Sequence, residues 1–179
     1  PATETPKAPA VCNGQPKAVP MDDKWFIRRC FADFSEPTFY GNELSGILYV
    51  IGGILTIFLN PKNPGYGDGN VYLVMLSSQL FAAAIGVFLY WHRWYELGWY
   101  NTFVPLASLT PAFVLFYGTK FYVVIVGAIV GAVIMPPIAD GIGRACAKDF
   151  AGYIGSVVSM FVCCLMFIAI FNYVPGFGG

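Results

Sequence analysis

The feature that most constrains this chain is a set of long apolar runs that contain no Asp, Glu, Lys, Arg or His. Three runs have the length of a helix that crosses a bilayer, which needs about 20 residues. Two shorter runs reach that length once the polar residues before them are placed at the headgroup level. The pattern predicts an all-α integral membrane protein, a bundle of five transmembrane helices at about 41–59, 71–91, 98–117, 121–139 and 150–174.

Composition supports lipid as the solvent of this chain. It is 57% apolar and only 11% charged, whereas soluble domains carry about 25% charged residues. No basic patch of the kind that nucleic acid requires is present, so we expect membrane lipid and not nucleic acid as a partner. Residues 1–21 are rich in Pro and Ala and lack the apolar centre of a signal peptide, so we expect a flexible tail there and a short C-terminal end at 175–179.

The basic residues predict an orientation. With five spans and a cytoplasmic N-terminus, the C-terminus lies on the opposite side, and Lys and Arg concentrate on the cytoplasmic side as the positive-inside rule expects. Treating the third run as a re-entrant loop would weaken this bias. The cytoplasmic side would hold Lys7, Lys17, Lys24, Arg28, Arg29, Arg93, Arg144 and Lys148, and the opposite side Lys62 and Lys120.

The segment 22–36 has the pattern of an amphipathic helix. Its apolar residues share one face, Asp22 or Asp23 can cap its start, and Pro37 ends it. We expect an interfacial helix whose basic residues lie near anionic headgroups, with a helix packed on a partner protein as the alternative. The apolar face is formed by Ile27, Cys30, Phe31 and Phe34, and the residues pointing elsewhere are Arg28, Arg29 and Asp33.

Two prolines, Pro136 and Pro137, interrupt the fourth run. A break at the middle of the membrane usually faces protein or water and can mark a binding site. These prolines come about 24 Å along the run at 1.5 Å per residue, near its end. A kinked exit from the membrane, followed by a polar turn, is therefore the favoured interpretation.

Small residues at helical spacing predict close helix packing. They let two backbones approach where no hydrophobic force drives association. Whether these faces meet within the chain or against another chain stays open at this point. The predicted packing residues are Ala82, Gly86, Gly127, Gly131, Gly152 and Ser156.

Mildly polar residues within the second and third runs are the best candidates for contacts with a solute. A proline-loosened helix around Pro111 would expose carbonyls to a polar solute. The alternative is that these side chains only hydrogen-bond between helices. The candidates are Ser77, Ser78, Gln79, Ser108 and Thr110.

His92 is the single histidine and the first ligand to consider if haem or a pigment were bound. With Glu96 it makes an incomplete metal site, and the aromatic residues around it are typical of an interfacial belt. No cofactor or metal is required by the sequence. No set of nucleophile, base and orienting group is present, so we expect no enzymatic activity.

Two functional classes remain. The first is a non-catalytic helical subunit of a larger membrane assembly, with other subunits or copies of itself as partners. Spans without charged residues and the small-residue faces favour it. The second is a small permease or channel for a neutral or weakly polar solute that acts as a homo-oligomer, favoured by the polar residues within the spans.

Overall fold

The fold is described by a computed structural model that covers residues 21–38, 41–60, 69–146 and 153–177, where all regular elements are helices. The flexible tail and Gly152 of the sequence predictions lie outside these residues. The elements are α1 (Trp25–Ser35), the 3-10 helix η1 (Glu36–Thr38), α2 (Glu43–Leu59), α3 (Gly69–Leu89), α4 (Trp91–Leu97), α5 (Val104–Ala107), α6 (Leu109–Tyr117), α7 (Phe121–Ala145) and α8 (Ile154–Phe171).

The helical character of the described residues is confirmed, and their apolar helices fit a membrane protein. Three helices are long and apolar enough to cross a membrane, over Asn70–Leu89, Phe121–Ala145 and Ile154–Phe171. A fourth crossing is reached only if Trp25–Thr38 and Glu43–Leu59, which are bent by 77°, count as one span. The described helices therefore supply three to four candidate spans rather than the predicted five.

The third predicted span is a broken helix. Residues 98–103 are not helical, and α5 and α6 have four and nine residues with a break at Ser108. Pro111 explains the break, because its ring clashes with the carbonyl of Ala107 four residues earlier and it has no N–H to donate. Together the two helices and Ser108 between them extend about 21 Å at 1.5 Å per residue, less than the hydrocarbon core of about 30 Å.

The fourth predicted span is longer in the structure than in the prediction, whereas the third is shorter and broken. The helix α7 continues through Pro136 and Pro137 to Ala145, where we expected an exit near 139 and a polar turn. Pro137 cannot donate to the carbonyl of Val133, and the hydroxyl of Tyr90 donates to that carbonyl instead, at 2.7 Å. A substitute donor from the end of α3 thus supports a helix that two prolines would otherwise weaken.

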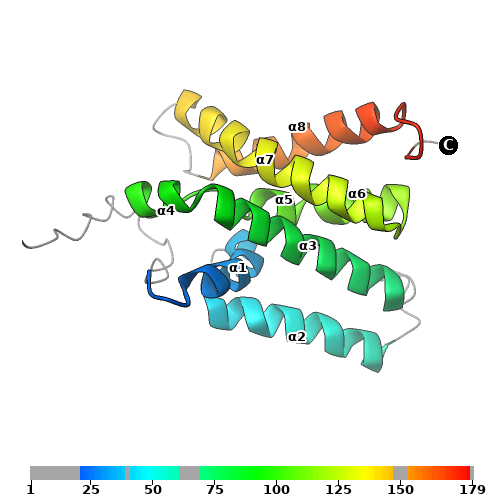
Figure 1. Cartoon of the computed structure of the whole chain (residues 1–179), viewed down its shortest axis with the longest axis horizontal. Coiled ribbons are helices and arrows are strands. Elements are labelled where there is room, and N and C mark those ends of the chain that lie inside the picture. The colour runs from blue at the N-terminus through cyan, green and yellow to red at the C-terminus, as the bar shows by residue number, and fades with distance from the viewer. Residues whose placement is uncertain (1–20, 39–40, 61–68, 147–152, 178–179) are drawn as a thin grey trace, which may run out of the picture.

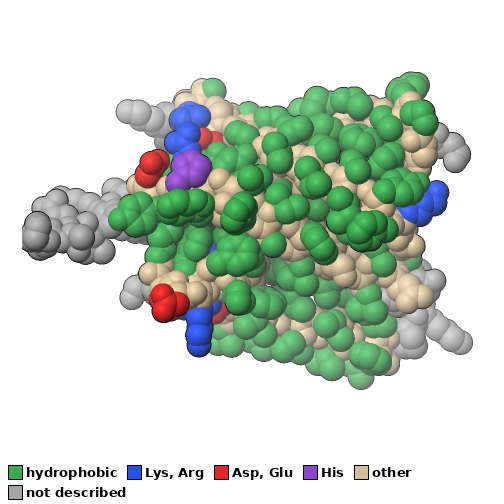
Figure 2. All heavy atoms as spheres, viewed as in Figure 1, with side chains coloured by type: hydrophobic (Ala, Val, Ile, Leu, Met, Phe, Trp, Pro, Cys, Tyr) green, Lys and Arg blue, Asp and Glu red, His purple; other side chains and the backbone are tan. Residues whose placement is uncertain are grey.

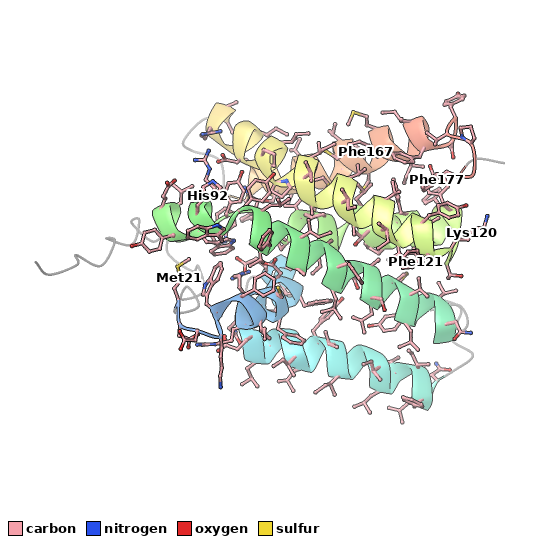
Figure 3. All side chains as sticks on the ribbon, in the orientation of Figure 1. Met21, His92, Lys120, Phe121, Phe167 and Phe177 are labelled. Atoms are coloured by element: carbon pink, nitrogen blue, oxygen red, sulfur yellow. The ribbon has the colours of Figure 1, made fainter. Side chains whose placement is uncertain are left out.

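The helices lie side by side with α2 at one edge (Figure 1). In the main body α7 packs on α3 and α8, and the broken helix α5–α6 packs against all three. The helix α1 fills the space between α2, α3 and α5. Met21 and His92 lie at one end of the bundle, and Lys120 and Phe177 lie at the other (Figure 3).

Small residues set the distances between the helices of the main body. A Cβ added at Gly127 would lie 2.9 Å from the ring of Phe113, and one at Gly131 would lie 2.8 Å from Cβ of Pro105. A Cβ at Gly86 would make an ordinary contact, 3.5 Å from the carbonyl oxygen of Thr102. Within the main body the closest approach is at Gly155, which was not among the predicted packing residues. A Cβ there would lie 2.2 Å from the carbonyl oxygen of Ala139.

The outer surface is that of a protein in lipid. In Figure 2 hydrophobic side chains cover the middle of the molecule, and charged side chains gather at its two ends. Along α2 the single buried residue is Gly46, whereas Leu48 is 58% and Phe58 is 77% exposed. Such an apolar band between two polar ends fits a bilayer around the bundle.

Candidate functional site

The predicted solute-contacting residues on α3 do not form one group. Ser77 is exposed on the outer surface and donates to the carbonyl of Leu73 at 2.8 Å. Ser78 is buried and donates to the carbonyl of Met75 at 2.7 Å. Both serine hydroxyls donate their hydrogen to a carbonyl of their own helix, so neither donates it to another group.

Gln79 is the predicted residue that reaches the broken helix. Its Nε2 donates to the carbonyl oxygen of Leu106 at 3.0 Å. Beside the break, the hydroxyl of Ser108 donates to Val104 at 2.7 Å and that of Thr110 to Pro105 at 3.2 Å. The structure therefore brings Gln79, Ser108 and Thr110 to the same break, where each of them donates to a backbone carbonyl.

The predicted packing residues also lie inside the chain. Ala82 is fully buried, and Gly127 and Gly131 of α7 face α6 and α5. Ser156 of α8 donates to Oδ1 of Asn101 at 2.7 Å, in a buried contact with the connector before α5. In the described residues these faces meet neighbouring helices of the same chain.

His92 lies on α4 at the end of the bundle that also holds Met21 (Figure 3). Its side chain is exposed, and its ring lies edge-on to Trp91 with centroids 6.3 Å apart. Within the described part of the chain, no group of three or more His, Cys, Asp or Glu side chains could hold a metal ion. Haem or pigment binding through His92 stays an untested expectation.

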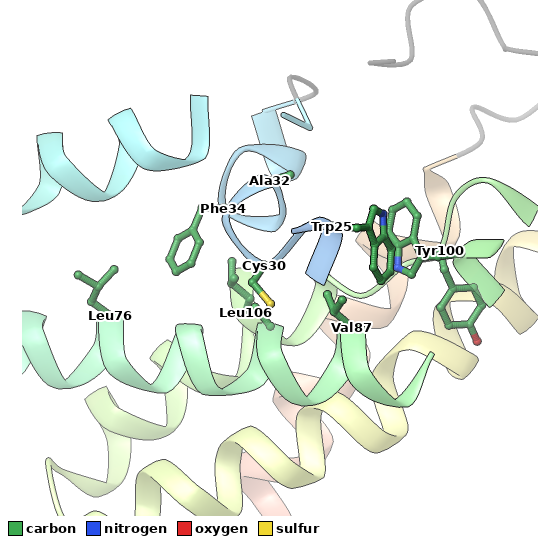
Figure 4. Close-up of a cluster of buried hydrophobic side chains, with 10 residues drawn as sticks. Trp25, Cys30, Ala32, Phe34, Leu76, Val87, Tyr100 and Leu106 are labelled. Atoms are coloured by element: carbon green, nitrogen blue, oxygen red, sulfur yellow. The ribbon is translucent and has the colours of Figure 1, made fainter. Parts of the chain in front are cut away.

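The prediction of an interfacial helix was wrong about which face of α1 is buried. We expected Ile27 on the buried apolar face and Arg29 and Asp33 directed elsewhere. Instead Ile27 is 61% exposed, whereas Arg29 is 1% and Asp33 0% exposed. Cys30 and Phe34 are buried as expected and meet Leu76, Val87 and Leu106 (Figure 4). The helix is thus packed into the bundle with Arg29 and Asp33 inside and Arg28 partly exposed.

Arg29, Asp33 and Glu36 form a buried ionic cluster. The guanidinium of Arg29 donates through Nε to Oδ1 of Asp33 at 3.1 Å and through Nη2 to Oε2 of Glu36 at 2.9 Å. Asp33 follows Arg29 by four residues and Glu36 by seven, so helical geometry places all three on one face. Pairing offsets the large cost of burying charges, which explains why this face can be inside.

The connector between α4 and α5 completes the cluster. Nε1 of Trp99 donates to Oε1 of Glu36 at 2.6 Å, and the hydroxyl of Thr102 donates to Oδ1 of Asp33 at 3.2 Å. The ring of Trp94 lies under the guanidinium of Arg29, with Cζ 4.2 Å from the ring centroid. Such cation–π contact is strongest where water is excluded. Of the aromatic residues predicted as an interfacial belt, Trp94 thus contacts an internal cation and Trp99 binds its counter-ion, Glu36.

Two polar atoms at this cluster have no hydrogen-bond partner among the described residues. They are Oδ2 of Asp33 and Nε1 of Trp94, and both are buried. Buried polar atoms are nearly always satisfied, because leaving one unpaired costs free energy. This pair of atoms singles out the cluster as the most unusual chemical environment in the described part of the molecule.

The exposed ion pairs lie at the same end of the helix bundle. Arg28 pairs with Asp22 at 2.7 Å and with Glu43 at 2.6 Å, which ties α1 to the start of α2. Asp140 pairs with Arg144 at 3.0 Å along α7, an i,i+4 pair whose arginine is 71% exposed. Pairs of this kind contribute little to stability because water competes for them.

Sequence reasoning missed the cluster although part of its signal was present. The spacing of Arg29, Asp33 and Glu36 shows that they share a helix face. What it lacked was the position of Trp94, Trp99 and Thr102, which follow more than 60 residues later. A comparison of the chain with protein-family models, with curated proteins and with solved structures found no match.

Proposed function

We propose that this chain is a non-catalytic helical subunit of a larger membrane assembly. It would cross the membrane five times, by α2, α3, the broken helix α5–α6, α7 and α8, with its N-terminus in the cytoplasm. The excess of basic residues on one side supports that orientation. Its partners would be other membrane subunits or copies of itself, and lipid would cover the rest of its apolar surface.

The observation that carries this proposal is that polar side chains within the spans are hydrogen-bonded to carbonyls of this chain. Ser78, Gln79 and Thr110 each donate to a carbonyl of this same chain. A solute pathway needs polar groups that are free to replace the water around a solute. Here the candidate donors are engaged with backbone carbonyls of this chain, and Gln79 joins α3 to α5, which favours a structural role.

The face available to a partner is the outer side of α2. This helix is attached chiefly through α1, and its outward side chains are large and apolar. Lipid or neighbouring helices can cover such a surface, and packing between helices is favoured where side chains interlock. The exposed large apolar residues of α2 are Leu44, Ile47, Leu48, Tyr49, Ile51, Leu55, Phe58 and Leu59.

The first test is the mass and composition of the native particle after gentle extraction from its own membrane. We expect a particle much larger than one chain, containing other polypeptides. Leu48→Ala combined with Leu55→Ala should release the chain from this particle while it stays folded. The matched control is Leu115→Ala, because that exposed leucine lies on α6, away from α2.

The second candidate is a small permease or channel, and the break at Ser108 favours it. Discontinuous helices in transporters expose carbonyls that coordinate solutes, and Gln79 already meets such a carbonyl here. A monomer or homo-oligomer without other polypeptides would count against the subunit proposal. Solute flux in vesicles that Gln79→Ala changes, with Ser77→Ala as the silent control, would then establish transport.

A further inference from the structure

The buried cluster on α1 carries an uncompensated charge. With all side chains in their usual states, Arg29 contributes +1 and Asp33 and Glu36 contribute −1 each, so +1 −1 −1 leaves −1. The three side chains are at most 6% exposed. A net charge that is buried without a partner is costly, and ionisable groups in that position usually neutralise instead.

The hydrogen bonds show where a neutralising cation would go. Both oxygens of Glu36 accept a hydrogen bond, one from Trp99 and one from Arg29. On Asp33, Oδ1 accepts from Arg29 and from Thr102, whereas Oδ2 accepts from no described residue. One carboxylate oxygen of the cluster is therefore bare.

Among the described residues, Arg29 is the basic residue in contact with the cluster. The elements packed against α1 are η1, α2, α3, α5 and, through the ring of Trp94 on Arg29, α4. The helices α3 and α5 contain no charged residue, and Glu43 of α2 is engaged with Arg28. On α4, His92 and Glu96 are exposed and Arg93 is half-buried, whereas the ion pairs that Asp33 and Glu36 form are with Arg29. Cys30 on the same helix is a further titratable neighbour, and it is neutral when protonated.

From this geometry we propose that Oδ2 of Asp33 binds one proton in the folded protein, so that the Arg29–Asp33–Glu36 cluster is a proton-binding site. A metal cation is disfavoured because it requires several ligands, and no group of three or more candidate ligand side chains lies in the described part of the chain. A proton needs one oxygen. Its uptake forms one O–H bond and brings the cluster to zero net charge.

Proton binding at this position links pH to the docking of α1. With the proton bound, Arg29 faces a single carboxylate charge from Glu36 and the cluster is neutral. When the proton leaves, the bare Oδ2 becomes a buried anion without a donor, a state that favours exposure to water. Since Arg29, Asp33 and Glu36 all belong to α1 and η1, we expect the docking of this segment against Trp99 and Thr102 to weaken as the pH rises.

Infrared spectroscopy of the purified full chain in lipid nanodiscs tests the proposal, because a protonated carboxyl has a carbonyl band that an ionised one lacks. In wild type we expect a protonated carboxyl that persists above about pH 6, beyond the range of ordinary aspartates. Asp33→Asn should remove this band. Glu36→Gln keeps one acceptor oxygen for Trp99 or Arg29 and brings the charge sum to zero, so the midpoint should fall by at least about one pH unit.

The matched control is Glu96→Gln, which removes an exposed carboxylate at the same end of the bundle and should leave the band unchanged. Wild type without a protonated carboxyl above about pH 5 would overturn the proposal. So would a midpoint that Glu36→Gln leaves in place, or a band that survives Asp33→Asn. Stabilisation by added Na⁺ or Mg²⁺ with no protonated carboxyl would show that a metal cation occupies the site instead.

A thermal measurement keeps the test decisive if the infrared bands overlap. A carboxyl that is protonated more readily in the folded state stabilises the fold at low pH, and that contribution is lost as the pH rises through its folded pKa. Because the contribution is lost between the unfolded pKa of an aspartate, about 4, and the raised folded pKa, the unfolding midpoint of wild type should fall more steeply than that of Glu36→Gln between about pH 4 and pH 7. Equal slopes for the two proteins would contradict the proposal.

Discussion

At the residue scale, the hydrogen bond between Tyr90 and Val133 compensates for Pro137. Tyr90→Phe removes the hydroxyl that donates to this carbonyl at 2.7 Å and leaves the ring in place. The loss should reduce the free energy of unfolding by about 1 kcal/mol, the usual net value of one such bond. The measurement is the thermal unfolding midpoint in detergent, with Tyr95→Phe as a control because Tyr95 is exposed.

The same substitution made in a Pro137→Ala variant shows whether the loss of stability depends on Pro137. Pro137→Ala restores an N–H that can donate to Val133 within the helix, so Tyr90→Phe should cost clearly less in that background. An equal loss in both backgrounds would mean that Tyr90 does not act through the carbonyl that Pro137 leaves without a donor. This double-mutant cycle isolates one contact, because both substitutions change the donor to one atom, the carbonyl oxygen of Val133.

At the element scale, α7 and α8 are held at a distance that only glycine permits. A Cβ at Gly155 would lie 2.2 Å from the carbonyl oxygen of Ala139 and 2.6 Å from the backbone nitrogen of Gly143. Because these are backbone atoms, the helices themselves must separate. Gly155→Ala should therefore destabilise the protein by about 1–3 kcal/mol, measured as a lower midpoint of aggregation on heating.

The matched control for this prediction is Gly141→Ala on α7. A Cβ at Gly141 would meet no atom within 4 Å. Alanine also favours a helix over glycine by up to about 1 kcal/mol, so this variant should be as stable as wild type or more stable. Equal effects of the two substitutions would show that helix propensity, not the approach of the two backbones, controls the result.

The elements also show what the sequence could and could not reveal. Long uncharged runs predicted α3, α7 and α8, because lipid exposure leaves a strong local pattern. A loosened helix was predicted around Pro111, but the break at Ser108 and the non-helical residues 98–103 were not, because they depend on neighbours distant in sequence. The inward face of α1 was wrongly predicted because a charged face reads as exposed. Only the partners Trp99 and Thr102, supplied by the fold, make its burial possible.

At the scale of the whole molecule, the open question is how many times the chain crosses the membrane. Glu96 on α4 and Lys120 before α7 flank the broken helix, which is too short to cross as a regular span. Figure 3 shows His92 and Lys120 at opposite ends of the bundle. If the bundle axis follows the membrane normal, then α5–α6 and the connector before it complete a crossing.

Labelling with a membrane-impermeant thiol reagent decides whether α5–α6 completes a crossing. In a parent with Cys12, Cys146 and the half-buried Cys164 replaced by Ser, Lys120→Cys should be labelled on intact cells. Glu96→Cys and Arg144→Cys should be labelled only after the membrane is opened, and the parent should stay unlabelled. Cys30 and Cys163 are buried and can remain. Labelling of Glu96→Cys and Lys120→Cys from the same side would make α5–α6 a re-entrant segment and reduce the number of crossings.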